Sequence, residues 1–256
     1  MTPISDLMKK HELERVEGIC EEHGAFATVR LRGTDAATCP KCFAAKIAKE
    51  SAEAAFRTRV AHLREISHIP ERFAETGFAS FRCTNPKMQK AIEETQVFMR
   101  KVRNEQVAHV WRTMMLTGVP GTGKTHLACA LANNLVSRGV SVRYTTAPEM
   151  LADIKRAYST DGMTEASQID RYVSAHSLLI LDEIDVMRIG NDNDTGLLFA
   201  VINGRYNANR PVVVVSNQPA AALGAFVSDR VASRLMENSI HIVCDWADFR
   251  RSNAVS

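Results

Sequence analysis

Short apolar runs alternate with amphipathic stretches over the second half of the chain. The runs at 114–116, 178–181 and 211–215 are continuous, which is typical of strands that are buried on both faces of a parallel sheet. The intervening stretches read as helices, and the one that follows the glycine-rich loop ends at Gly139. We therefore predict an α/β domain with a parallel sheet between helices. Its strands are expected at 114–116, 140–146, 177–182, 211–217 and 240–244, and its helices at 127–136, 148–158, 192–210 and 228–238.

The first half of the chain has a different pattern. Residues 4–17 have a weak helical period, and residues 26–32 alternate like a strand. Residues 43–66 lack Gly and Pro and predict a long helix, which the Ile69-Pro70 step should end. A further helical run covers 86–110. The long helix has a narrow apolar stripe and +3 local charge, so it either binds a partner or is a solvated linker.

A glycine-rich loop follows the first strand of the α/β domain. The sequence Gly118-Val-Pro-Gly-Thr-Gly-Lys-Thr125 has the spacing of a P-loop. Phosphate oxygens must approach the backbone N–H groups closely there, and Cβ atoms would block that approach. The helix beginning near Lys124 directs its positive dipole end at the same anion. We expect Lys124 to reach the β- and γ-phosphates and the Thr125 hydroxyl to lie on Mg²⁺.

Two acidic residues follow the apolar run at 178–181, as in the Walker B pattern. Asp182 would help to hold Mg²⁺, and Glu183 would polarise the attacking water. Asn217 ends the next strand and could bond the γ-phosphate or that water, although many strands end in Asn. Arg230 and Arg234 lie one turn apart on a predicted helix. Either could act on a neighbouring subunit's nucleotide, or form an ordinary surface salt bridge.

Three cysteines and a histidine near the N-terminus have metal-ligand spacing. Cys20 and His23 form a C-x2-H pair, and Cys39 and Cys42 form a C-x2-C pair fifteen residues later. Thiolate and imidazole are the donors that zinc prefers. The alternative is three ordinary thiols and a surface histidine. Four protein ligands leave no open position for a substrate, so we predict a structural zinc ion.

Composition narrows the class of protein only a little. The chain has 256 residues, 45% hydrophobic and 24% charged, with a net charge of +3. Those values are ordinary for a globular protein, and the charge does not indicate a nucleic-acid binder. Neither a secretory signal nor an apolar run of membrane-spanning length is visible. We therefore expect a cytoplasmic protein, in which clustered cysteines favour metal binding over disulfides.

The order of these motifs resembles an AAA+ ATPase core, and more narrowly the DnaC/IstB group. That group contains replicative helicase loaders and the ATPase subunits of transposons. The residues carrying the likeness lie in 118–128, 179–184, 216–217, 229–235 and 245–250, within a match over about 68–252. The resemblance implies an AAA+ core preceded by a small zinc-binding module and a linker helix.

The resemblance also implies roles for individual residues. Asn217 would be the sensor, Arg234 the trans-acting finger, and Arg230 a second arginine that senses nucleotide. Lys155, Arg156 and Tyr158 lie where this group tends to touch single-stranded DNA, although a solvated helix end would carry the same residues. The nucleotide-binding residues would be Gly118, Pro120, Gly121, Thr122, Gly123, Lys124, Thr125, His126 and Arg230.

We predict a helicase-binding module at 1–66 and an ATPase domain at 67–256. The protein would use ATP, Mg²⁺ and Zn²⁺, bind a hexameric replicative helicase, deliver it to single-stranded DNA, and self-associate through the AAA+ domain. One alternative is an IstB-like helper of a DNA transposase. Another is a non-enzymatic zinc adaptor, against which the intact Asp182-Glu183 pair argues.

Overall fold

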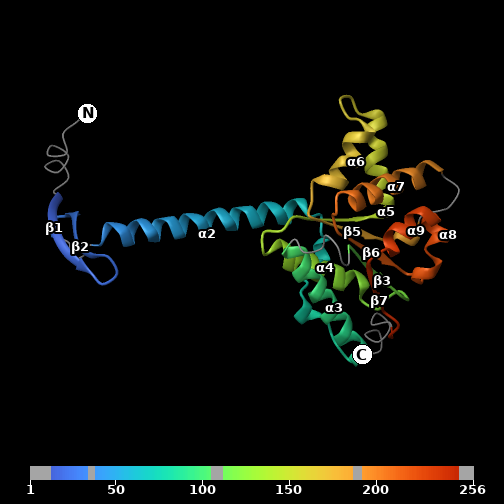
Figure 1. Cartoon of the computed structure of the whole chain (residues 1–256), viewed down its shortest axis with the longest axis horizontal. Helices are drawn as coiled ribbons and strands as arrows, with labels where there is room; N and C mark the ends of the chain where they lie inside the picture. The colour runs from blue at the N-terminus through green and yellow to red at the C-terminus, as the bar shows by residue number, and fades with distance from the viewer. Residues whose placement is uncertain (1–12, 34–37, 105–111, 187–191, 248–256) are drawn as a thin grey trace. The chain divides into compact units, whose positions relative to one another are not determined.

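The computed structural model describes residues 13–33, 38–104, 112–186 and 192–247 of the chain (Figure 1). The chain divides into two compact units, Met1–Arg59 and Val60–Ser256. None of the helices in these described ranges is long and apolar enough to cross a membrane.

The first unit contains an antiparallel hairpin of β1 (Leu13–Cys20) and β2 (Gly24–Leu31). The helical prediction was wrong for residues 13–17, which belong to β1, and residues 4–12 lie outside the described ranges. Pairing with β2 overrides the weak helical period, because each β1 residue from Leu13 to Cys20 has a partner opposite it. The strand predicted at 26–32 is confirmed as β2.

The long helix predicted at 43–66 is confirmed as α2 (Pro40–Ile66), which begins in the first unit and ends in the second. Of its apolar stripe, Leu63 is buried, whereas the Phe56 side chain is 47% exposed. Only the last part of the stripe therefore joins a core.

The second unit is built on a five-stranded parallel sheet with the order β4-β5-β6-β3-β7. This architecture confirms the predicted α/β fold class. Because the strands are parallel, the loops that follow β3, β5 and β6 meet at one edge of the sheet. The strands are β3 (Thr113–Thr117), β4 (Val142–Thr146), β5 (Leu178–Asp182), β6 (Val212–Ser216) and β7 (Ser239–Val243).

Helices cover both faces of this sheet (Figure 1). Of the predicted helix at 148–158, the residues up to Lys155 form the α-helix α5, and the residues after it form a 3-10 turn. The helix α6 (Glu165–Ser174) was not predicted. The α-helices are α3 (Pro86–Arg103), α4 (Lys124–Val136), α5 (Ala147–Lys155), α6 (Glu165–Ser174), α7 (Asp192–Asn207), α8 (Gly224–Val227) and α9 (Asp229–Met236). The 3-10 turns are η1 (Glu71–Phe73), η2 (Phe78–Ser80), η3 (Arg156–Ser159), η4 (Ile184–Val186) and η5 (Ala220–Ala222).

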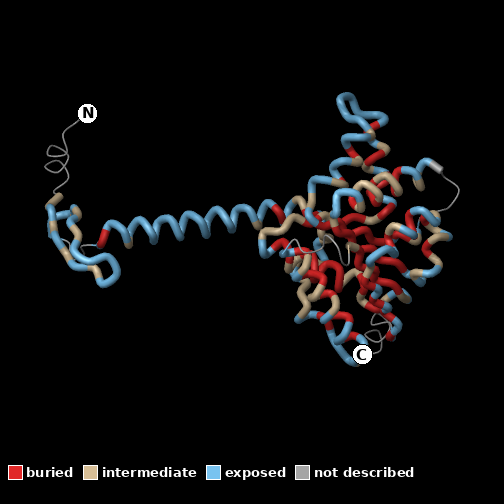
Figure 2. Tube along the Cα trace, in the orientation of Figure 1, coloured by how far each residue is buried: buried red, intermediate tan, exposed pale blue. Residues whose placement is uncertain are grey.

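Alternate side chains of the three central strands, β3, β5 and β6, enter two separate cores. Met114 and Leu116 pack with α3 and α4, whereas Met115 between them packs with α5, α7 and α9 on the other face. Figure 2 shows the buried residues concentrated in the sheet and its flanking helices. This double burial explains why the central strands read as continuous apolar runs, whereas the edge strands β4 and β7 contain polar residues.

Candidate functional site

The P-loop connects β3 to α4 and is held in an unusual backbone conformation. Gly118 has φ +134°, and a Cβ there would lie 2.2 Å from the Cys244 carbonyl oxygen. Gly123 caps α4 with φ 88°. The Lys124 side chain is 6% exposed, and its ammonium group donates to the carbonyl oxygens of Gly118 and Val119, both at 2.8 Å. The loop therefore places the buried Lys124 ammonium group and the N-terminus of α4 beside each other.

The two acidic residues after β5 lie against this loop. The Thr125 hydroxyl donates to Asp182 Oδ2 at 2.9 Å, so motifs 57 positions apart in sequence are in contact. Asp182 is 5% exposed. A hydroxyl and a carboxylate are the oxygen donors that Mg²⁺ uses at phosphate sites. The pair of residues predicted to hold Mg²⁺ is therefore brought together by the fold.

Glu183 and Asn217 lie at the same edge. Glu183 has φ 56°, a region that non-glycine residues rarely adopt and that is found preferentially at functional sites. Partial burial, and then the neighbouring charge of Asp182, raises the pKa of the Glu183 carboxyl. The Asn217 backbone N–H donates to Asp185 Oδ1 at 3.0 Å, which fixes the end of β6.

A cavity of about 1140 Å³ joins all these groups. It is larger than a typical small-molecule pocket of roughly 300–1,000 Å³. One wall is aromatic: the His126 ring lies edge-on to Phe81 at 5.4 Å between centroids and to Phe73 at 6.5 Å. Burial lowers the pKa of His126. The predicted site residues that line the cavity are Pro120, Gly121, Gly123, Lys124, Thr125, His126, Arg156, Asp182, Glu183 and Asn217.

The two arginines of α9 lie elsewhere. Neither Arg230 nor Arg234 is among the described residues that line the cavity. The Arg234 guanidinium lies over the Tyr206 ring, 4.4 Å from its centroid, and pairs with Glu237 at 3.8 Å. Arg234 therefore does not act on the cavity of its own chain in this conformation.

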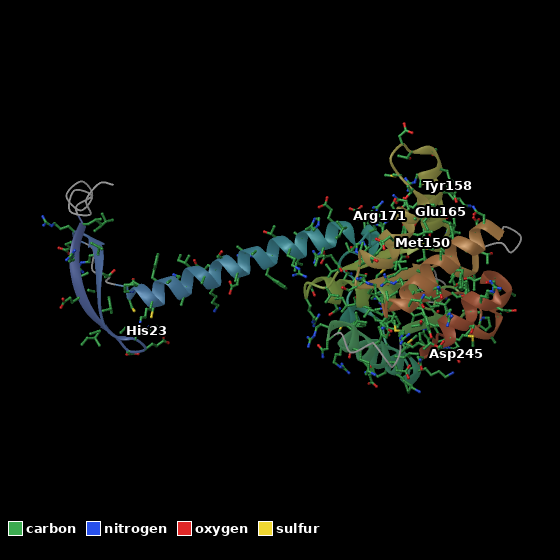
Figure 3. The ribbon with its side chains drawn as sticks, turned by 45° about the horizontal axis from the view of Figure 1, so that its top comes forward. His23, Met150, Tyr158, Glu165, Arg171 and Asp245 are labelled. Carbon is green, nitrogen blue, oxygen red and sulfur yellow. The ribbon has the colours of Figure 1, made fainter. Side chains whose placement is uncertain are left out.

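The three residues predicted to contact DNA have protein partners. Lys155 pairs with Asp194, Arg156 pairs with Asp153, and the Tyr158 hydroxyl donates to Glu165. Figure 3 shows Tyr158, in the 3-10 turn that follows α5, near Glu165 at the start of α6. Arg156 and Tyr158 remain largely exposed, whereas Lys155 is partly covered.

Sequence reasoning missed two residues that shape the site. The Trp246 indole N–H donates to the Thr122 carbonyl at 2.8 Å and so anchors the P-loop from beyond β7. The Tyr144 hydroxyl donates to Asp182 Oδ2 at 2.7 Å. A buried Trp or Tyr reads from sequence as an ordinary core residue, and no spacing rule links these positions to the P-loop. Their roles depend on which strands are neighbours.

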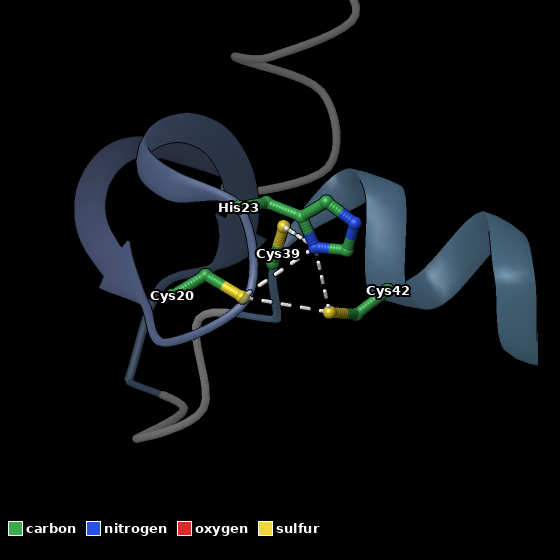
Figure 4. A group of neighbouring side chains, drawn as sticks. All are labelled: Cys20, His23, Cys39 and Cys42. Carbon is green, nitrogen blue, oxygen red and sulfur yellow. Dashed lines mark hydrogen bonds between the residues drawn. The ribbon is translucent and has the colours of Figure 1, made fainter.

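The four residues with zinc-ligand spacing lie together in the first unit (Figure 4). Their ligand atoms are all within 4.8 Å of one another. His23 Nδ1 is 3.6 Å from Cys20 Sγ, 3.9 Å from Cys39 Sγ and 3.3 Å from Cys42 Sγ. Ligands at zinc-bond distance in a tetrahedron are about 3.3–3.8 Å apart, so the donor set fits one zinc ion.

Comparison with known proteins identifies the family. The family described as IstB-like ATP binding protein matches residues 25–246, most of the chain. The chain belongs to this family. The DnaC helicase loader of Buchnera aphidicola subsp. Acyrthosiphon pisum is 25% identical over 187 residues, which cover 72% of this chain and 73% of the relative.

A second relative of the IstB-like chain comes from a transposable element. The insertion sequence IS5376 putative ATP-binding protein of Geobacillus stearothermophilus is 30% identical over 129 residues, 50% of this chain and 49% of the relative. Among solved structures, the DnaC helicase loader covers 68% of this chain and 98% of its own, with a TM-score of 0.58 and 20% identity. This likeness shows the fold, and with the family it makes the chain an AAA+ ATPase.

Proposed function

We propose that this IstB-like ATPase loads a replicative helicase onto single-stranded DNA. The observation that carries the proposal is the similarity to a helicase loader over 72% of the chain. The first unit, with its cysteine–histidine cluster, supplies a second surface outside the ATPase fold. We assign helicase binding to residues 1–66 and ATP-dependent switching to 67–256.

We propose roles for the cavity residues on the basis of their placement. The P-loop amides and Lys124 would bind the phosphates, while Thr125 and Asp182 would hold Mg²⁺, which neutralises phosphate charge when bound. Glu183, at the cavity rim with a raised carboxyl pKa, would orient the attacking water and accept its proton. Asn217 lines the same cavity and would report the state of the γ-phosphate.

We further propose that Arg234 completes the site of a neighbouring subunit. Its guanidinium lies outside its own cavity, and its side chain is 39% exposed. An arginine supplied in trans makes hydrolysis depend on assembly, because it stabilises transition-state charge only when two copies meet. Arg230, exposed on the same helix, would sense the nucleotide.

DNA contact is proposed for the rim of the cavity beside α5 and η3. Exposed Arg156 and Tyr158 could approach a phosphate and stack on a base, as single-strand binders do. Lys155 would have to leave its pair with Asp194 to contribute.

The experiment for the loader proposal uses the full chain and the replicative helicase encoded by the same genome. The wild-type protein should co-elute with the helicase and contain about one zinc ion per chain. Cys39→Ser combined with Cys42→Ser should lose both the zinc and the co-elution. Cys83→Ser is the matched control, because Cys83 is exposed and lies outside the cluster.

Each outcome has a distinct meaning. A wild-type protein that does not bind the helicase contradicts the loader function. A zinc-free variant that still binds the helicase contradicts only the role of the zinc-binding first unit in helicase binding, and leaves the loader function in place. The transposase-helper alternative, which the Geobacillus stearothermophilus relative supports, predicts co-elution with a transposase encoded beside the gene instead.

A further inference from the structure

Tyr144 is a buried residue whose hydroxyl contacts the proposed magnesium site. It lies on β4, an edge strand of the sheet, and its side chain is 6% exposed. The register pairs Thr146 with Asp182, so Tyr144 is two residues before the position opposite the carboxylate. Its hydroxyl reaches along the strand and donates to Asp182 Oδ2 at 2.7 Å.

The hydrogen bonds to the Asp182 carboxylate divide into two kinds. The Glu183 backbone N–H donates to Oδ1 at 2.8 Å, and two hydroxyls, those of Thr125 and Tyr144, donate to Oδ2. The Thr125 hydroxyl is the group that a P-loop turns toward its metal ion. If Thr125 turned to a bound metal ion, the Tyr144 hydroxyl would be the remaining side-chain donor to Oδ2 among the described residues.

A backbone hydrogen bond holds Tyr144 on the side of β4 that has no neighbouring strand. Its backbone N–H donates to the Ser67 carbonyl at 2.8 Å, and Ser67, just after α2, is completely buried. The ring packs in the core between the sheet and α4. A side chain anchored in this way can hold a carboxylate in one orientation at little entropic cost.

We propose that Tyr144 is a positioning residue for the metal site: its hydroxyl orients the Asp182 carboxylate toward the nucleotide-bound metal ion. Removal of a group that orients a metal ligand typically lowers metal affinity 10- to 100-fold. The inference depends on the ATP site and is independent of helicase loading.

The test is Tyr144→Phe in the full chain, which removes only the hydroxyl. Mn²⁺ binding to the ADP complex, followed by electron paramagnetic resonance, should weaken about 10-fold. ADP binding without metal should stay within about twofold of wild type, because the P-loop is untouched. The Mg²⁺ concentration for half-maximal hydrolysis should rise by a similar factor.

Tyr172→Phe is the matched control. Tyr172 is also buried and lines the same cavity, and its hydroxyl donates to Asp153 at 2.7 Å, an aspartate outside the Walker B motif. This variant should keep wild-type Mn²⁺ affinity. Unchanged Mn²⁺ affinity in Tyr144→Phe overturns the proposal, and so does an equal loss in Tyr172→Phe, which would indicate general loosening of the cavity wall.

A measurement on the wild-type sequence covers the case in which Tyr144→Phe fails to fold. The chain has four tyrosines, so fluorotyrosine labelling gives four ¹⁹F signals, assigned by Phe substitution of the other three. Adding Mg²⁺ to the ADP complex should shift the Tyr144 signal and leave that of Tyr206 unchanged. An unmoved Tyr144 signal would refute the role.

Discussion

At the residue scale, the P-loop glycines show how much of the local structure a sequence motif predicts. The spacing alone placed Gly118, Gly121 and Gly123 in a tight loop beside phosphate, and all three have positive φ. It did not predict that Gly118 is also packed against the backbone of Cys244. That contact depends on β7 lying beside β3, which no local pattern reveals.

Gly118→Ala should therefore disrupt the nucleotide site through two effects, the backbone strain at its positive φ and a steric clash with Cys244. The new Cβ would meet the Cys244 carbonyl at 2.2 Å and push the P-loop away from β7. We expect nucleotide affinity to fall at least about tenfold, a cost of about 1.4 kcal/mol, and the melting temperature to drop. Fluorescence titration with a labelled ADP and thermal unfolding measure the two effects.

Gly162→Ala is the control for this prediction. Gly162 also has a positive φ, +78°, but nothing lies within 4 Å of its added Cβ. It should cost only the backbone strain, about 1–2 kcal/mol, and leave nucleotide affinity unchanged. Equal effects of the two variants on affinity would show that contact with Cys244 is irrelevant.

At the element scale, the sequence predicted the strands of the sheet and most of its helices, because continuous apolar runs and capping residues are local signals. It misassigned β1, whose weak helical period is overridden by pairing with β2. It also missed α6, a short polar helix in which only Gln168 and Tyr172 are buried. A buried residue of another helix bonds the backbone at the C-terminal end of α6.

That residue is Arg205, which is completely buried on α7. Its guanidinium donates to backbone carbonyls of Tyr172, Val173, His176, Ser177 and Pro211 at 2.8–3.3 Å. These carbonyls end α6 and flank β5 and β6. One side chain thus satisfies the buried acceptors at the junction of three elements.

Arg205→Met should remove the guanidinium donor from all five carbonyls. Those of His176 and Pro211 keep a second donor, from Arg210 and from the Leu179 N–H, whereas those of Tyr172, Val173 and Ser177 lose the bond from Arg205 with no such side-chain replacement among the described residues. Each buried unsatisfied acceptor costs about 1–3 kcal/mol, so we expect a loss of at least about 3 kcal/mol in the free energy of unfolding. Arg210→Met serves as the comparison, because Arg210 donates a bond to the His176 carbonyl from the same region. Urea unfolding that gave similar losses for both variants would contradict this role of Arg205.

At the scale of the whole molecule, the sequence predicted an ATPase domain that follows a cysteine–histidine module along the chain. The parallel sheet brings Lys124, Thr125, Asp182, Glu183 and Asn217 to one cavity, as the motif order implied. Partner surfaces were less predictable, because Arg234 and the proposed DNA residues lie on helix surfaces where the same side chains form ordinary ion pairs.

Two variants distinguish a role of Arg234 in hydrolysis from its ion pair with Glu237. Arg234→Ala should retain ATP binding but reduce assembly- or DNA-stimulated hydrolysis by about 10³-fold or more, the typical contribution of a trans arginine. Glu237→Gln removes the charge that Arg234 faces but keeps the arginine, and it should retain stimulated hydrolysis. If both variants behaved alike in a phosphate-release assay, Arg234 would be only a surface ion pair.

The central claim is that ATP lies against the P-loop with Asp182 and Glu183 facing its phosphates. Calorimetric titration of Mg²⁺–ATP into Glu183→Gln tests this most directly, with Lys124→Ala titrated alongside. Glu183→Gln should bind one ATP per chain without turning it over, and Lys124→Ala should bind at least about tenfold more weakly. Absence of binding in Glu183→Gln, or equal binding in both variants, would contradict the claim.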